Sequence, residues 1–161
     1  MSAPWAGSVT PIPPPPEAVP HTSNLVYAGL VTGAWSGLLS LLVYGLGRLL
    51  GVPFEVFRPG SETLEVVPWL LVLLVPLVAA VGGALLAAIA LGRRHARAIV
   101  FWAGTALALL SCANPLVQPA EVLWSSRIWL LIPHVITWAL VVPQLARIVG
   151  DSEPGMFMVR D

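Results

Sequence analysis

Charge is scarce in this chain. Only 10% of its 161 residues are charged, whereas a soluble domain typically carries about 25%, and the formal net charge is zero. All eight cationic residues are arginine, and lysine is absent. Because there is no basic excess to attract a phosphate backbone, the sequence predicts no nucleic-acid partner.

Cysteine and clusters of metal ligands are also lacking. The one cysteine, Cys112, excludes an internal disulfide and a cysteine-based metal cluster. Because it lies in an apolar stretch, we interpret it as a small buried side chain. A metal site usually needs three or more ligands, and the three histidines, His21, His95 and His134, lie far apart in the chain. We therefore predict no metal and no cofactor.

Apolar length is what the chain has in abundance, since 57% of its residues are hydrophobic. A bilayer core of about 30 Å needs about 20 helical residues, and none of the long uncharged stretches shows the polar face of a soluble helix. The sequence therefore predicts an all-α fold, a polytopic membrane four-helix bundle within residues 24–149. The four predicted membrane spans are residues 25–47, 66–91, 98–117 and 128–146.

The two ends of the chain differ in composition from these spans. Residues 1–23 contain seven prolines, four of them consecutive at positions 13–16. Such a segment favours an extended, polyproline-like chain without a core of its own, so we predict a disordered proline-rich N-terminal tail. Residues 150–161 form a short C-terminal tail.

The arginines indicate an orientation. Arg93, Arg94 and Arg97 fall in the six-residue connection "GRRHAR" between the second and third predicted spans. Short arginine-rich connections stay in the cytoplasm. With four spans, this rule predicts a multi-pass protein of the plasma membrane with both termini in the cytoplasm.

A glycine repeat marks one face of the first predicted span. Gly29, Gly33 and Gly37 are four residues apart, and residues at this spacing stack on one helix face. Glycines there let a second helix backbone approach closely. The repeat is consistent with a self-association face or with packing inside the four-helix bundle, and we favour packing inside the bundle.

A lone histidine lies in the fourth predicted span. By depth, His134 falls near Ser111 and Asn114 of the third span and Ser40 of the first, so we predict a polar intramembrane cluster of these four residues. A structural role that pins the helices together is favoured over a contact to a ligand or ion. Catalysis ranks last, because a serine–histidine hydrolase needs an orienting acid and the four spans contain no Asp, Glu or Arg. We predict no catalytic residue.

Three stretches resemble a family of small four-helix membrane proteins of high-GC Gram-positive bacteria, a domain of unknown function. They are "YGLGRLLGVPFEV", "LLSCANPL" and "LIPHVITWALVVPQLAR", and the resemblance covers roughly residues 24–149. The chain departs from the family at Pro133, where the family often has methionine before the histidine. The resemblance implies a four-helix integral membrane protein and brings no known activity.

Two functions from different classes remain open. The first is a small integral membrane protein that acts as a structural or accessory component through interactions within the membrane, with the lipid bilayer and a membrane-protein partner or a second copy as its partners. The alternative is an oligomeric component that transports a small molecule or ion through a polar pocket around His134. A membrane enzyme ranks third.

Overall fold

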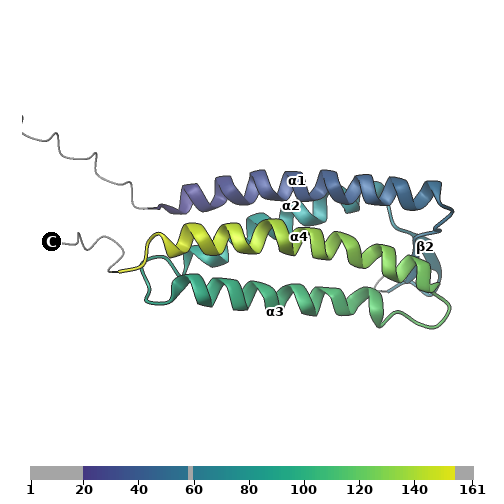
Figure 1. The fold of residues 1–161 in the computed structure, drawn as a ribbon. Helices are drawn as coiled ribbons and strands as arrows, with labels where there is room; N and C mark the ends of the chain where they lie inside the picture. Colours follow the sequence, from purple (N-terminus) through teal and green to yellow (C-terminus); the bar gives the residue numbers. More distant parts are fainter. Residues whose placement is uncertain (1–19, 58–59, 155–161) are drawn as a thin grey trace, which may run out of the picture.

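The computed structural model describes residues 20–57 and 60–154. Most of the proline-rich segment predicted over residues 1–23 and the last residues of the C-terminal tail, 155–161, lie outside the described residues. The elements, shown in Figure 1, are α1 (Thr22–Leu49), β1 (Glu55–Phe57), β2 (Leu64–Val66), α2 (Trp69–Ala88), α3 (Ala96–Leu116) and α4 (Trp124–Gly150).

The four predicted helices are present, and each is long and apolar enough to cross a membrane. Their ends differ from the predicted spans by a few residues. Helix α2 is shorter than predicted because Pro68 precedes its first turn in an extended conformation and the chain turns after Ala88. Helix α4 is longer because it continues past Arg127 and Arg147, the charged residues that flank the predicted span 128–146.

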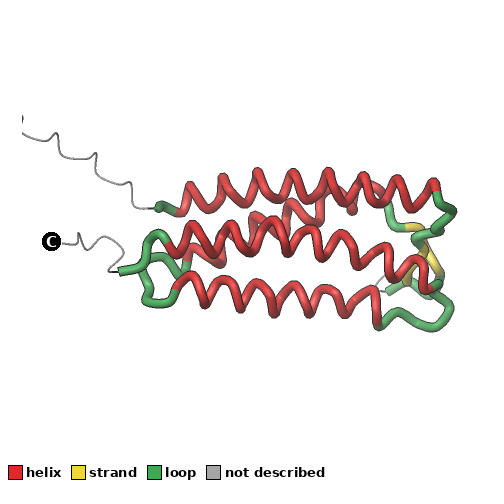
Figure 2. The backbone as a smooth tube through the Cα atoms, in the orientation of Figure 1, coloured by secondary structure: helices red, strands yellow, loops and turns green. Residues whose placement is uncertain are grey.

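The helices alternate in direction, so the connections between them lie at two opposite ends of the bundle (Figure 2). We call one the terminal end: it contains the start of α1, the α2–α3 connection at residues 89–95 and the end of α4. We call the other the hairpin end: it contains residues 50–68 and the α3–α4 connection at residues 117–123.

A short antiparallel hairpin closes the hairpin end. Strands β1 and β2 pair Glu55 with Val66 and Phe57 with Leu64, in the connection between the first two helices, where the sequence analysis predicts no strand. Phe54, just before β1, is only 1% exposed and lies with its ring centroid 4.5 Å from that of Tyr44 in α1. The hairpin is therefore docked onto α1 by an aromatic contact.

The glycine repeat of α1 faces α2. A Cβ atom added to Gly29 would lie 2.9 Å from the Cβ of Ala84, and one added to Gly33 would lie 2.8 Å from the Cβ of Ala80. One added to Gly37 would collide with the backbone carbonyl oxygen of Leu73 in α2. The α1 and α2 backbones thus approach closely along three helical turns, as small residues allow.

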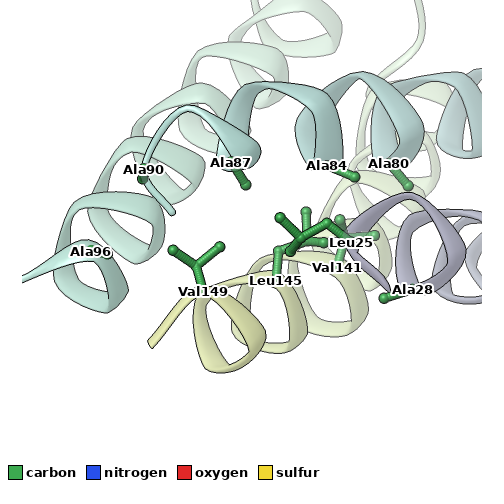
Figure 3. Close-up of a cluster of buried hydrophobic side chains, with 10 residues drawn as sticks. All are labelled: Leu25, Ala28, Ala80, Ala84, Ala87, Ala90, Ala96, Val141, Leu145 and Val149. Atoms are coloured by element: carbon green, nitrogen blue, oxygen red, sulfur yellow. The ribbon is translucent and has the colours of Figure 1, made fainter. Parts of the chain in front are cut away.

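The packing is not that of a closed bundle. Helix α1 packs against α2 and α4, and α4 packs against α3, whereas α2 and α3 barely touch. The best-packed region is a cluster of small and branched side chains at the terminal end, where α2 and α4 meet the start of α1 and of α3 (Figure 3). Its members are Leu25, Ala28, Ala80, Ala84, Ala87, Ala90, Ala96, Val141, Leu145 and Val149. The four helices therefore surround an opening between α2 and α3.

Candidate functional site

The opening between α2 and α3 is a groove with a volume of about 950 Å³. Its lining extends from Leu71 to Ala87 in α2 and from Ile99 to Pro115 in α3, and the facing side chains of α4 form its floor. From α1 it takes Tyr44, at the hairpin end. The groove therefore runs along nearly the whole length of α2.

The walls of this groove are apolar and exposed. Leu86 of α2 is 60% exposed and Leu107 of α3 is 56% exposed, so neither side chain is covered by another helix. A Cβ atom added to Gly82 would meet no atom within 4 Å, which leaves the α2 backbone accessible from the groove. A membrane-embedded segment can therefore approach α2 closely at this point.

His134 lies in the floor of the groove and is partly buried. Its Nδ1 atom lies 2.7 Å from the carbonyl oxygen of Leu130, one turn earlier in α4. A carbonyl oxygen only accepts, so this contact places the ring proton on Nδ1. The Nε2 atom is then an acceptor, and it has no hydrogen-bond partner among the described residues.

The predicted polar cluster is only partly brought together. Ser111 and Asn114 line the same groove as His134, whereas Ser40 does not. The Ser111 hydroxyl donates to the carbonyl of Ala108 in its own helix at 2.7 Å, and the hydrogen bond of His134 also stays within its helix. Because a helical side chain leans back over the preceding turn, the nearest acceptor to each is a carbonyl of the same helix. No hydrogen bond joins the four predicted residues to one another within the described chain.

Two hydrogen bonds that the sequence analysis missed hold the floor in place. The hydroxyls of Ser36 in α1 and Thr137 in α4 lie 2.7 Å apart. On the other side of α4, the Trp138 indole Nε1 donates to the Thr105 hydroxyl of α3 at 3.1 Å. Their positions one turn beyond His134 were visible in the sequence, but the partners depend on how the helices pack. Helix α4 is thus tied to both neighbours beneath the groove.

Comparison with known protein families gives a match over most of the chain. Residues 20–151 match the family described as "Family of unknown function (DUF6069)". The chain belongs to this family. The matched range takes in all four helices and the hairpin, and the family description assigns no activity. No curated protein and no solved structure matches the chain.

At the hairpin end, this DUF6069 chain uses an arginine as a loop clamp. Arg127 is 6% exposed, and its guanidinium donates to the carbonyl oxygens of Val122, Pro119 and Leu116 at 3.1, 2.6 and 3.1 Å. It also lies over the Trp124 ring, 4.7 Å from the centroid. This single cation therefore fixes the α3–α4 connection beside the end of the groove.

At the terminal end, the DUF6069 chain has a second cavity of about 490 Å³ between α3 and α4. Its rim carries His95 and Arg97, and its wall is formed by Ala98, Phe101, Pro143 and Ala146. Glu153, just after α4, also lines it and accepts a hydrogen bond from the Arg97 backbone N–H at 2.7 Å. The lining therefore combines two basic residues and one carboxylate at the terminal end with apolar side chains of α3 and α4.

Proposed function

We propose that this protein is a small integral membrane protein that acts as a structural or accessory component through interactions within the membrane. In this proposal, one transmembrane helix of a partner protein binds in the groove between α2 and α3. The single observation that carries the proposal is that α2 and α3 do not pack on each other, so that one side of the bundle is left open along most of α2.

The length and walls of the groove suit a helix. A helix of 20 residues is about 30 Å long, which is also about the thickness of the hydrocarbon core, and α2 has 20 residues. Inside a bilayer, apolar side chains gain little by leaving lipid, so helices associate where small residues allow close packing. Gly82 on one wall and Ala103 and Ala108 on the other supply such positions.

Polar groups in the groove give the partner an orientation. The Nε2 atom of His134 accepts, and the Asn114 amide both donates and accepts, and neither group has a hydrogen-bond partner in the described chain. A serine, threonine or asparagine on the incoming helix would pair with them, each such bond contributing about 0.6 kcal/mol. The groove thus selects helices that carry a polar residue near the hairpin end.

A small-molecule or ion transport component is the second candidate. The same unpartnered atoms of His134 and Asn114 favour it, since they would also bind a polar solute. The groove contains one charged residue, Arg93, at its terminal end, and no carboxylate among its described lining residues. A proton or cation path built on one histidine lacks a second relay group, so this function requires further copies of the chain.

The two glycines Gly82 and Gly45 allow a matched experiment. Both lie inside helices, and an added Cβ atom meets nothing within 4 Å at either position. Gly82 lines the groove, whereas Gly45 in α1 does not. Leucine at either site improves helix propensity by a similar amount, but only Gly82→Leu obstructs the groove. Affinity purification in mild detergent, with identification of the co-purifying membrane proteins, compares the two variants with the wild-type chain.

We expect the wild-type chain and Gly45→Leu to retain the same membrane protein, and Gly82→Leu to lose it while remaining folded. Retention of that protein by Gly82→Leu would exclude the groove as the docking site. If a second copy of the chain is retained in its place, the interaction is self-association through the same surface. If the groove binds a solute only, the wild-type chain retains no membrane protein and the proposal fails.

A further inference from the structure

The charges of the described chain are divided between the two ends of the bundle. The terminal end carries Arg93, Arg94, Arg97 and Arg147 against the two acids Asp151 and Glu153. The hairpin end has the opposite balance, with Arg48 and Arg127 against Glu55, Glu62, Glu65 and Glu121. The terminal end is therefore electropositive and the hairpin end electronegative within the residues that the structure describes.

The arginines at the two ends are also used differently. At the hairpin end, Arg48 donates to the carbonyl of Pro53, and Arg127 holds three carbonyls of the α3–α4 connection. At the terminal end, the guanidinium groups of the four arginines make no hydrogen bond or ion pair within residues 20–57 and 60–154. No described residue pairs with these guanidinium groups, so they are available to bind a ligand.

One of these arginines, Arg97, lines the cavity between α3 and α4. The cavity between α3 and α4 has Arg97 and His95 at its mouth and Phe101, Pro143 and Ala146 below. The Arg97 stem packs against α4, since a Cβ atom added to Gly150 would lie 3.0 Å from the Arg97 Cβ. Arg97 is exposed and lines this cavity, and the apolar residues of the lining lie on α3 and α4. This order, basic then apolar, matches the headgroup and acyl chain of an anionic lipid.

The Glu153 carboxylate lines the same cavity as Arg97. Glu153 accepts a hydrogen bond from the Arg97 N–H at 2.7 Å, and the neighbouring Ser152 hydroxyl accepts one from the Gly92 N–H at 3.0 Å. The segment after α4 therefore folds over the α2–α3 connection and places a negative group where a phosphate would lie. Like charges repel, so the Glu153 carboxylate weakens the binding of any second anion.

We propose that the cavity between the terminal ends of α3 and α4 binds the phosphate group of an anionic phospholipid, with Arg97 as its principal contact and Glu153 as a competing anion. A free phosphate ion offers the same headgroup chemistry. The lipid is the ligand here because the cavity wall formed by Phe101, Pro143 and Ala146 lies on helices able to cross a membrane, where acyl chains lie.

The test uses the full chain in mild detergent and native mass spectrometry, which counts bound lipids. The probes are dioleoylphosphatidylglycerol and the zwitterionic dioleoylphosphatidylcholine. Arg97→Gln removes the charge at the rim, and Arg94→Gln, on the same connection but outside the cavity lining, is the matched control. Glu153→Gln keeps a side-chain oxygen for the Arg97 N–H and removes only the competing charge.

The wild-type chain is expected to retain the phosphatidylglycerol in preference to the phosphatidylcholine. Arg97→Gln is expected to weaken that preference about tenfold or more, because it removes the charged hydrogen bonds to the phosphate group. Arg94→Gln leaves it nearly unchanged, and Glu153→Gln strengthens it. Should Arg97→Gln fail to fold, Glu153→Gln is compared with Asp151→Asn, which removes an acid from the same end but outside the cavity lining. A site is strengthened only by Glu153→Gln, whereas diffuse attraction is strengthened equally by both.

Three results would overturn the proposal. Equal retention of both lipids would show that headgroup charge is not recognised. Equal losses in Arg97→Gln and Arg94→Gln would show diffuse attraction to the whole basic end in place of a site. Retention of inorganic phosphate by a chain that retains neither lipid would show that the cavity takes the free ion and not the lipid.

Discussion

At the scale of single residues, the two buried serines of α1, Ser36 and Ser40, differ in whether their hydroxyls are hydrogen-bonded. Both lie on the same face, one turn apart, and both are 0% exposed. The Ser36 hydroxyl lies 2.7 Å from that of Thr137, whereas the Ser40 Oγ atom has no partner among the described residues. A buried hydroxyl without a partner costs free energy that its pairing would recover.

Replacing each of these serines with alanine therefore gives opposite results. We expect Ser40→Ala to leave the free energy of unfolding unchanged or to raise it, because no hydrogen bond is lost. Ser36→Ala is expected to lower it by about 0.6 kcal/mol, the average value for an interhelical bond in a membrane. Unfolding of the detergent-solubilised chain measures both, and a larger loss in Ser40→Ala would reveal a partner for that hydroxyl.

The second prediction at this scale concerns the stability of a His134 variant. Its hydrogen bond to the Leu130 carbonyl stays within α4, so the ring does not tie two helices together. We expect His134→Leu to change the free energy of unfolding by no more than about 1 kcal/mol, the net value of one hydrogen bond. Thermal unfolding in detergent provides the measurement. A loss of several kcal/mol would mean that Nε2 has an essential structural partner.

At the scale of elements, the α1–α2 contact depends on glycines that have no room for a side chain. An added Cβ atom at Gly37 would collide with the Leu73 carbonyl, whereas one at Gly45 in the same helix would meet nothing within 4 Å. Gly37→Ala should therefore destabilise the protein by about 1–3 kcal/mol, and Gly45→Ala should stabilise it by up to about 1 kcal/mol. Equal thermal midpoints for the two variants would contradict the close α1–α2 packing.

The α3–α4 connection is stabilised by the hydrogen bonds of Arg127. Arg127→Leu leaves three carbonyl oxygens without their donor, and we expect a loss of about 2 kcal/mol or more, since bonds from a charged donor are strong. Arg48→Leu removes one exposed bond to Pro53 and should cost less than about 1 kcal/mol. Chemical unfolding of the two variants provides the comparison. Arg127 would not be the clamp of this connection if the two losses were equal.

The elements themselves could be predicted because their physical cause is local. A charge-free stretch of about 20 residues must form a helix if it lies in lipid, and all four stretches did so. The hairpin was missed because Glu55–Phe57 and Leu64–Val66 are only three residues each and show no resolvable alternation. Their pairing is stabilised by the docking of Phe54 on Tyr44, a contact between residues ten positions apart that periodicity does not reveal.

At the scale of the whole molecule, the groove could not be predicted from the sequence. Helix α2 is apolar on every face, and the few polar residues of α3 do not form a continuous polar face. Hydrophobicity therefore does not say which face packs on a neighbour and which is left open. The placement of Ser111, Asn114 and His134 near one depth was read from residue counts, and all three line the groove. Their hydrogen bonds were not predictable, because backbone carbonyls of the same helix compete with distant side chains.

The division of charge predicts the orientation of the molecule. The arginines without a partner gather at the terminal end, and arginine-rich ends stay in the cytoplasm. A reporter enzyme fused after Asp161 and active only in the cytoplasm should therefore be active. A reporter active only outside the cell should be active when it is inserted at Gly60, in the connection between β1 and β2. Activity of the second type after Asp161 would reverse the orientation.

The central claim is that the α2–α3 groove receives a transmembrane helix, and site-specific photo-crosslinking in the membranes of the native host tests it most directly. The probe residue p-benzoylphenylalanine is placed at Leu86 and Leu107 on the two groove walls, and at Leu42 on α1 as a control that is 61% exposed. We predict adducts with the same membrane protein from Leu86 and Leu107, none from Leu42, and loss of both adducts in Gly82→Leu. Lipid adducts alone at the groove positions, or the same protein captured from Leu42, would contradict the account.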